Sequence, residues 1–197
     1  WLGKRRMDEA IKLVPELDVE LIFRPFELDP TIPVEGVDYK AHMKEKFGSD
    51  SGRDRANTMR DALIQYGQEE GIPYQFDRIT RRPNSFNAHR LVRWAQGQQK
   101  GAEAKEALFK AYFSDGRDIG ETEVLVDIAR EINLDPSIVA ELMPTEEALF
   151  QQMGISGVPT YIAHRRIAVQ GAETAEKLAK FLQHAATQLP EERPAQG

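Results

Sequence analysis

The stretch Gly154–Tyr161 has the sequence Gly-Ile-Ser-Gly-Val-Pro-Thr-Tyr and decides how the rest of the chain is interpreted. Its two glycines, Gly154 and Gly157, permit sharp turns, and the first can end a preceding helix. An apolar run follows, and a second run at 166–170 comes after a short polar pair, which predicts a β-hairpin. Because proline cannot donate to a ladder, Pro159 belongs at the first residue or the edge of a strand.

The bond between Val158 and Pro159 leaves two interpretations open. One is an ordinary entry from a loop into a strand, and the other is a cis-proline loop. A helical pattern follows at Glu173–Leu189, so the order is helix, Gly-Val-Pro-Thr turn, hairpin and terminal helix. This order resembles the closing half of a thioredoxin fold. We therefore expect Val158–Pro159 to be cis and to face the N-terminal end of the first helix.

Composition describes a soluble globular protein. The chain has 197 residues, 41% of them hydrophobic and 29% charged, which suits one domain with an insertion or two small domains. A formal net charge of −6, with no dominant basic stripe, argues against a nucleic-acid partner. No apolar run approaches the roughly 18 residues of a membrane span, so we expect no membrane partner.

The chain contains no cysteine and four histidines. The lack of cysteine excludes disulfides within these residues and favours a cytoplasmic location. The histidines show no metal-ligand spacing, so we expect no metal site.

Hydrophobic periodicity places the elements in order. A helix is predicted over Lys4–Val14 and a strand over Val19–Phe23, apolar enough to be buried on both faces. From Asp38 to Met153 the signals are almost wholly helical, with Asp38 as the cap of the first helix and one short extended piece at Tyr74–Asp77. Apolar stripes at helical spacing predict helices around 88–95 and 124–132. The predicted fold class is α/β, a thioredoxin-like fold with a large all-helical insertion. The predicted boundaries are a thioredoxin-like domain over 1–33 and 156–189, a helical insertion domain over 34–155, and a disordered tail over 190–197.

Nearly the whole chain resembles one branch of a known family. Five segments carry the resemblance in order: Trp1–Arg6, Arg24–Pro30, Pro83–Leu91, Ala107–Phe113 and Gly157–Thr160. They are similar to the FrnE-type branch of the DsbA-like oxidoreductases, which is related to 2-hydroxychromene-2-carboxylate isomerases and kappa-class glutathione transferases. The first segment resembles the residues that follow the branch's Cys-Pro-Trp-Cys motif. Asp29 departs from the pattern, because Asn is usual there.

The missing cysteine pair is the larger departure. In the thioredoxin fold, the strand before the active-site helix lies in the middle of the sheet. Without that strand, Val19–Phe23 and the strand that begins near Val158 would show unpaired edges inside the core, which is costly. We therefore expect roughly ten to twenty residues before Trp1, enough for the first strand and a loop with Cys-x-x-Cys.

The resemblance implies a thiol–disulfide oxidoreductase or isomerase. A cysteine thiolate at a helix N-terminus would attack a disulfide, with Pro159 as the cis-proline beside it. The backbone of Val158 would pair with an extended substrate, and Trp1, Asn84 and His89 are the other expected substrate-binding residues. Considered alone, Asn84 is equally well explained as a helix cap and His89 as a buried hydrogen-bonding residue.

Two other functions stay open at this point. One is a glutathione-dependent isomerase or transferase of the 2-hydroxychromene-2-carboxylate isomerase or kappa type, in which a serine replaces the first cysteine. The other is a binding module on the same fold without redox activity. We expect no bound cofactor, with glutathione as the alternative co-substrate. The expected partner is a protein or small-molecule disulfide, and the resemblance is compatible with a homodimer.

Overall fold

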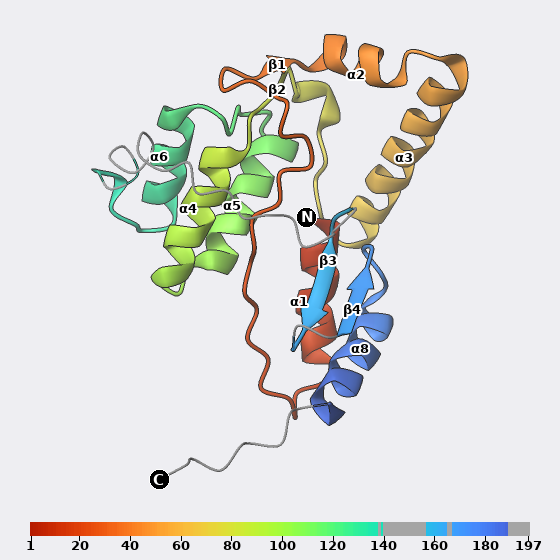
Figure 1. Ribbon diagram of the computed structural model, residues 1–197, viewed down its shortest axis with the longest axis vertical. Coiled ribbons are helices and arrows are strands. Elements are labelled where there is room, and N and C mark those ends of the chain that lie inside the picture. Colours follow the sequence, from red (N-terminus) through yellow and green to blue (C-terminus); the bar gives the residue numbers. More distant parts are fainter. Residues whose placement is uncertain (138, 140–156, 165–166, 189–197) are drawn as a thin grey trace. The chain divides into compact units, whose positions relative to one another are not determined.

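The computed structural model describes residues 1–137, 139, 157–164 and 167–188. Within them the chain forms seven α-helices, one short 3₁₀ helix and four short strands (Figure 1). The chain divides into two compact units. We call Trp1–Leu21 with Met153–Gly197 the hairpin unit, and Ile22–Gln152 the helical unit. The turn predicted at Gly154 and the tail predicted over 190–197 lie outside the described residues.

Among its described residues, the hairpin unit has two strands and two helices, coloured red and blue in Figure 1. Strand β3 (Thr160–Ala163) pairs antiparallel with β4 (Ile167–Gln170), so the predicted hairpin is present. Helix α1 (Leu2–Lys12) packs against α8 (Ala175–Thr187), which begins where the Thr174 side chain accepts a hydrogen bond from the amide of Lys177. The buried cluster between these elements consists of Met7, Ala10, Val14, Leu178 and Ala179.

The strand predicted at Val19–Phe23 is wrong, because these residues form no strand. The predicted alternation of side-chain burial is nevertheless present, because Val19, Leu21 and Phe23 are half-buried and the residues between them are exposed. A strand needs a partner for its ladder, and the amide of Phe23 instead donates to the side-chain oxygen of Gln96, 2.7 Å away. From Ile22 onward, this segment clusters with the helical unit.

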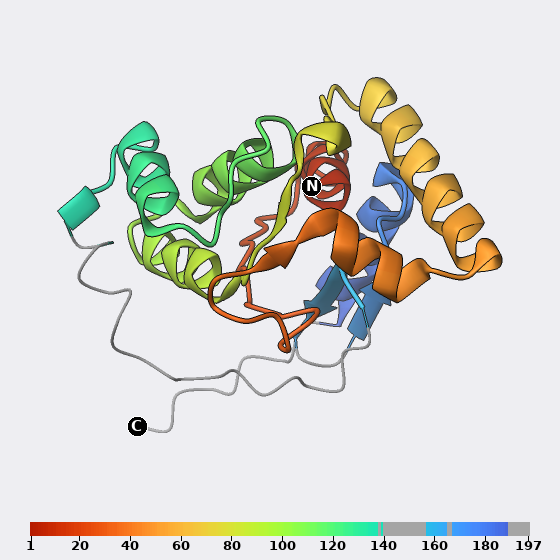
Figure 2. The same ribbon diagram turned by 90° about the horizontal axis from the view of Figure 1, so that it is seen from above.

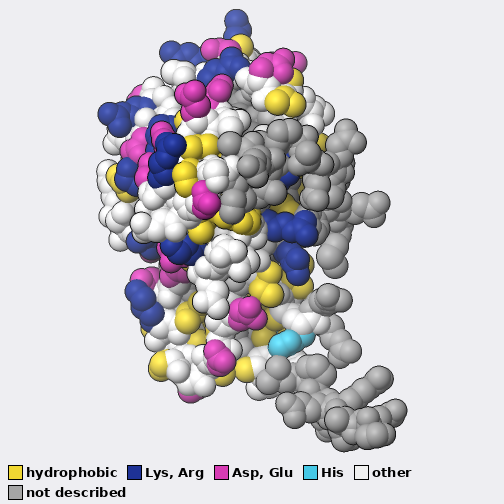
Figure 3. Space-filling view, turned by 90° about the vertical axis from the view of Figure 1, so that its left-hand side faces the viewer, with side chains coloured by type: hydrophobic (Ala, Val, Ile, Leu, Met, Phe, Trp, Pro, Cys, Tyr) yellow, Lys and Arg dark blue, Asp and Glu magenta, His cyan; other side chains and the backbone are white. Residues whose placement is uncertain are grey.

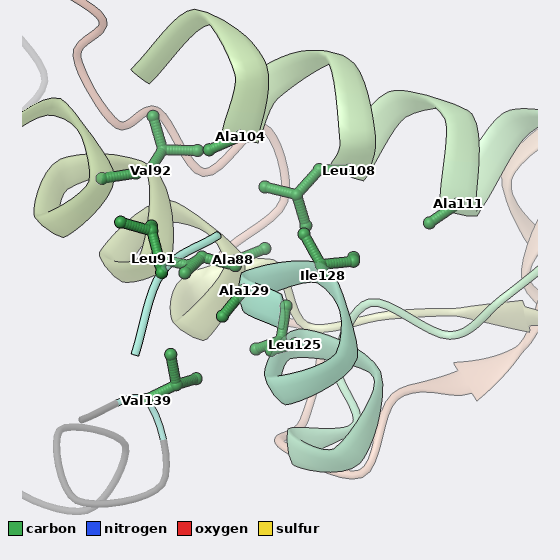
Figure 4. Packing of buried hydrophobic residues seen from close by; sticks show 12 residues of the cluster. Ala88, Leu91, Val92, Ala104, Leu108, Ala111, Leu125, Ile128, Ala129 and Val139 are labelled. Atoms are coloured by element: carbon green, nitrogen blue, oxygen red, sulfur yellow. The ribbon is translucent and has the colours of Figure 1, made fainter. Parts of the chain in front are cut away.

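The helical unit is built around three helices, α4 (Phe86–Gly97), α5 (Gly101–Phe113) and α6 (Thr122–Glu131). Leu91, Leu108 and Ile128, one from each of these helices, belong to one buried hydrophobic cluster, whose side chains are drawn in Figure 4. The apolar positions recur at helical spacing, so each helix presents one stripe to the common core. Figure 2 shows the same three helices from above.

Helices α2 (Tyr39–Phe47) and α3 (Asp50–Glu69) complete this unit and bury little of their surface. Asp38 caps α2 as predicted, accepting a hydrogen bond from the amide of Ala41 at 2.7 Å. Gly67 is the buried residue of α3, and it lies against Ile72 and Tyr74.

The prediction of an all-helical insertion is corrected by two short strands. Strand β1 (Val37–Asp38) pairs antiparallel with β2 (Arg81–Arg82). The piece predicted as extended at Tyr74–Asp77 instead enters a 3₁₀ helix, η1 (Phe76–Arg78). The two strands have two residues each and the 3₁₀ helix has three, so none of them is long enough to show a hydrophobic period in the sequence.

Candidate functional site

The first turn of α1 and the proline of the hairpin unit are in close contact. Gly3 has no side chain, and a Cβ placed there would lie 2.6 Å from Pro159 Cγ and 2.7 Å from the Tyr161 hydroxyl oxygen. Real Cβ atoms do not approach other atoms so closely, so only glycine fits without a shift of the loop. The sequence prediction that Pro159 faces the N-terminal end of the first helix therefore agrees with this geometry.

Tyr161 fixes this contact from the strand side. Its hydroxyl donates a hydrogen bond of 2.7 Å to the Gly3 carbonyl, linking β3 to the first turn of α1. Burial raises the pKa of Tyr161 to about 12, against a smaller lowering by the positive charge of Arg6. The hydroxyl therefore stays protonated and keeps donating throughout the neutral pH range.

The proline loop is anchored to the hairpin by polar contacts. The Pro159 carbonyl accepts a hydrogen bond of 2.8 Å from the amide of Gly171, and the Thr160 hydroxyl donates to the Gly157 carbonyl at 2.7 Å. Arg6 reaches from α1 to donate to the Ala172 carbonyl at 2.7 Å. These hydrogen bonds fix the position of the proline loop relative to the hairpin and to α1.

The first turn of α1 is electropositive. It contains no acidic residue, no side chain caps the helix, and Lys4, Arg5 and Arg6 follow one another. The positive end of the helix dipole lies in the same place. Lys4 pairs with Asp8 at 2.7 Å, which offsets part of this charge one turn further along. A thiolate or another anion beside the first turn would be stabilised by this arrangement.

The other predicted residues of the hairpin unit lie next to this contact. Trp1 is half-buried and precedes α1, with its carbonyl accepting from the amide of Arg5. The side chain of Val158 is 54% exposed, and the Val158–Pro159 peptide bond is cis. The structure thus gathers Trp1, Val158 and Pro159 around the start of α1, whereas their role in substrate binding stays a prediction.

Asn84 belongs to the helical unit, and both ends of its amide are used. Its nitrogen donates to the Ile32 carbonyl at 2.8 Å, and its oxygen accepts from the amide of Phe86 at 2.9 Å. The side chain therefore ties the loop before α2 to the first turn of α4. The bond to the amide two residues on is an Asx turn before α4, not a helix cap, because Ser85 is the N-cap residue and its side chain makes no capping hydrogen bond. A substrate role for Asn84 stays a prediction.

His89 also belongs to the helical unit, on α4. Burial, with a smaller contribution from the positive charge of Lys105, lowers the pKa of His89 to about 4. A hydrogen bond to the Phe26 backbone acts in the opposite direction. The imidazole is therefore neutral at pH 7, and its role in substrate binding stays a prediction.

Two residues of the contact were missed by sequence reasoning. Gly3 was recognisable in principle, because glycine is a poor helix former and its presence in a helical pattern points to a close approach. Nothing in the sequence indicated the hydrogen bond from the Tyr161 hydroxyl, because tyrosine is common in strands for its packing alone.

Charges elsewhere on the surface are mixed. On the face shown in Figure 3, Lys and Arg side chains are interspersed with Asp and Glu side chains. Among the residues that the structure describes, no group of His, Asp and Glu side chains could hold a metal ion. Within the same residues, no helix is long and apolar enough to cross a membrane.

A helix whose first turn packs on a proline loop, followed by an antiparallel hairpin and a terminal helix, defines a protein of the thioredoxin-like class. The family model of the DSBA-like thioredoxin domain matches residues 1–183. The chain belongs to this family.

Two relatives show how far the similarity extends. A solved structure, that of a probable DsbA oxidoreductase from Streptomyces coelicolor, matches with a TM-score of 0.84 at 26% identity. The match covers 98% of this chain and 86% of that one. The uncharacterised protein YwbO of Bacillus subtilis is 24% identical over 172 residues, and the match covers 82% of this chain and 79% of YwbO.

Proposed function

We propose that this protein is a thiol–disulfide oxidoreductase or isomerase of the FrnE-type branch, acting on protein or small-molecule disulfides. The reactive Cys-x-x-Cys in this proposal directly precedes Trp1. The observation that carries the proposal is the contact of Pro159 with Gly3 at the start of α1. Membership of the DSBA-like family and the likeness to a probable DsbA oxidoreductase support it.

The proposed chemistry consists of two successive thiol–disulfide exchange steps. The first cysteine thiolate attacks one sulfur of the substrate disulfide, a mixed disulfide forms, and the other substrate sulfur leaves as a thiolate that takes a proton. The second cysteine thiolate then attacks the mixed disulfide and releases the remaining substrate sulfur. The substrate disulfide is reduced and the cysteine pair is oxidised. The reverse sequence oxidises a dithiol substrate.

The residues of this chain would supply the surroundings of that reaction. The electropositive start of α1 would lower the thiol pKa and so raise the fraction of reactive thiolate. Pro159 offers no amide hydrogen and presents its ring to the site, while the exposed Val158 can pair its backbone with an extended substrate. Tyr161 and Gly3 would hold this loop at the correct distance from the helix.

The test is insulin reduction by the full-length protein, monitored with dithiothreitol as the electron donor. The proposal predicts that the protein accelerates the reduction and that changing the first cysteine to serine abolishes it, because a neutral hydroxyl is a poor nucleophile. A serine variant as active as the unchanged protein would contradict the proposal.

A second candidate, a glutathione-dependent isomerase or transferase, is equally compatible with the absence of cysteine from these residues. In that case the full-length protein carries a single serine before Trp1, binds glutathione and leaves insulin unreduced. Titration with glutathione, followed by calorimetry, therefore separates the two candidates on the same preparation.

A further inference from the structure

Helix α3 carries an apolar seam, which we define as Ala56, Met59, Leu63 and Tyr66. These residues recur at spacings of three and four, so they share one face of the helix. Met59 and Tyr66 are 59% and 40% exposed. Among the residues that the structure describes, neither buried cluster includes a side chain of this helix. Exposed apolar side chains that gather on one face are typical of an interaction surface.

A neighbouring side of α3 holds the helix to its own unit. The guanidinium carbon of Arg60 lies 5.8 Å from the ring centre of Phe76, and a guanidinium nitrogen pairs with Asp77 at 2.6 Å. Gly67 lies against Tyr74, because a Cβ placed at Gly67 would be 2.6 Å from a carbon of that ring. Arg60 and Gly67 are about two turns apart on one side, beside the seam and not on it. These contacts therefore position α3 and leave the seam exposed.

Opposite charges flank the two ends of the seam. Arg55 directly precedes the first seam residue, and Glu69 follows the last one by three positions. Both side chains are exposed, and the hydrogen bond of 3.2 Å that Glu69 accepts from Gln65 brings no opposite charge. Arg55 and Glu69 are two heptads apart, so they lie on the same flank and about 21 Å from each other along the helix. They are therefore too far apart to pair within one chain.

We propose that the seam binds the seam of a second copy of this chain, with the two α3 helices antiparallel. Met59 then packs on Leu63 of the partner subunit, and Ala56 packs on Tyr66 of the partner subunit. Ala62 lies at the centre of this arrangement in both copies, where a small side chain allows the two helices to approach closely. Because one two-fold axis relates the copies, the same contacts form on both sides of it.

The flanking charges select the antiparallel orientation. The two-fold axis brings Arg55 of each copy to Glu69 of the partner subunit, so both ends of the seam gain an ion pair. Parallel helices would instead place Arg55 beside Arg60 of the partner subunit and leave Glu69 past the end of the paired segment. The antiparallel pair also brings the two copies of Arg60 toward each other, but Asp77 of the same chain neutralises each of them.

Sedimentation velocity of the full-length protein at about 1 to 500 µM tests the proposal, with a reductant present so that no disulfide contributes. One helix face offers less than the roughly 800 Å² per partner of a standard interface, so we expect a reversible dimer with a Kd on the order of 10–100 µM. Met59→Glu places a charge in the seam and should abolish the dimer within this range. Val34→Glu is the matched control, because Val34 is 79% exposed and lies outside α3.

A charge swap tests the orientation. Arg55→Glu and Glu69→Arg each convert both symmetry-related ion pairs into like-charge pairs, so each should raise Kd about tenfold. The double variant Arg55→Glu/Glu69→Arg restores opposite charges across the interface, and its Kd should return to within about twofold of that of the unchanged protein. Circular dichroism checks that every variant is folded.

Three results would overturn the proposal. A chain that stays monomeric over the whole range would exclude a second copy and leave the seam to a partner of different sequence. A dimer that Met59→Glu weakens no more than Val34→Glu does would have another interface. A double variant that dimerises no better than either single variant would contradict the antiparallel pairing of Arg55 with Glu69.

Discussion

The helical unit and the hairpin unit differ in how they are held together. Among the described residues, the helical unit gathers 12 buried hydrophobic residues from α4, α5, α6 and the segment after α6, whereas the hairpin unit gathers five between α1 and α8. The site proposed for catalysis lies in the unit with the smaller cluster. The geometry of this site depends more on hydrogen bonds and on one glycine than on buried hydrophobic packing. Small substitutions there should therefore change the geometry of the site without unfolding the protein.

The largest expected effect comes from emptying the core of either unit. Leu125 and Leu178 are both fully buried, the first in the helical unit and the second in the hairpin unit. Each change to alanine should lower the free energy of unfolding by about 2–5 kcal/mol, because it leaves a cavity. Hydrogen exchange should lose protection in α4–α6 for Leu125→Ala, and in α1 and α8 for Leu178→Ala. Equal loss in both units for either variant would contradict two separate cores.

The next effect is a loss of stability at acidic pH, caused by His89 of the helical unit. The pKa of His89 is about 4 in the folded protein and near 6.5 when unfolded, so the unfolded chain binds more protons between these values. Stability should fall as pH drops from 6.5 toward 4, by up to about 3 kcal/mol. Urea unfolding at several pH values measures this slope. His89→Gln should reduce this dependence of the unfolding free energy on pH. An unchanged dependence in this variant would mean that other groups cause it.

A smaller effect is expected at the contact between α1 and the proline loop. Gly3→Ala inserts a methyl group against Pro159 and should cost about 1–3 kcal/mol of unfolding free energy. Gly97, the last residue of α4, has no atom within 4 Å of an added Cβ and provides the matched control. Gly97→Ala should be neutral or stabilise by up to about 1 kcal/mol. Thermal unfolding compares the two, and equal melting temperatures would disprove the tight contact.

The smallest expected effect comes from the tyrosine hydroxyl. Tyr161→Phe removes the hydrogen bond to the Gly3 carbonyl and keeps the ring, so it should cost about 0.5–1.5 kcal/mol. Denaturant unfolding of this variant, with Tyr39→Phe as a control in the helical unit, measures the difference. A loss no larger than that of the control would mean that the ring alone holds β3 to α1.

Sequence patterns predicted the helices well because each carries its own signal. The stripes of α4 and α6 and the Asp38 cap are local features, and they appear in the structure where the pattern places them. The strand at Val19–Phe23 failed for the opposite reason. Its pattern fixed which side chains are buried, but a strand exists only where another backbone pairs with it, and that partner is not encoded in the segment itself.

The candidate site was predictable only in part. The Gly-Val-Pro-Thr turn alone left two interpretations of Val158 and Pro159 open, and the resemblance of the helix, turn, hairpin and terminal helix to a thioredoxin fold identified them as site residues. The contact with Gly3 joins residues far apart in the chain, and no periodicity reports it.

The central claim is that the start of α1 and the Pro159 loop form one reactive site. The most direct test is the kcat/KM of insulin reduction for full-length protein with Gly3→Ala and with Gly97→Ala, each shown by circular dichroism to be folded. We predict that Gly3→Ala loses about tenfold or more, because a displaced loop misplaces the substrate, while Gly97→Ala stays within about twofold. A Gly3→Ala variant that reduces insulin as fast as the Gly97→Ala variant would contradict the claim.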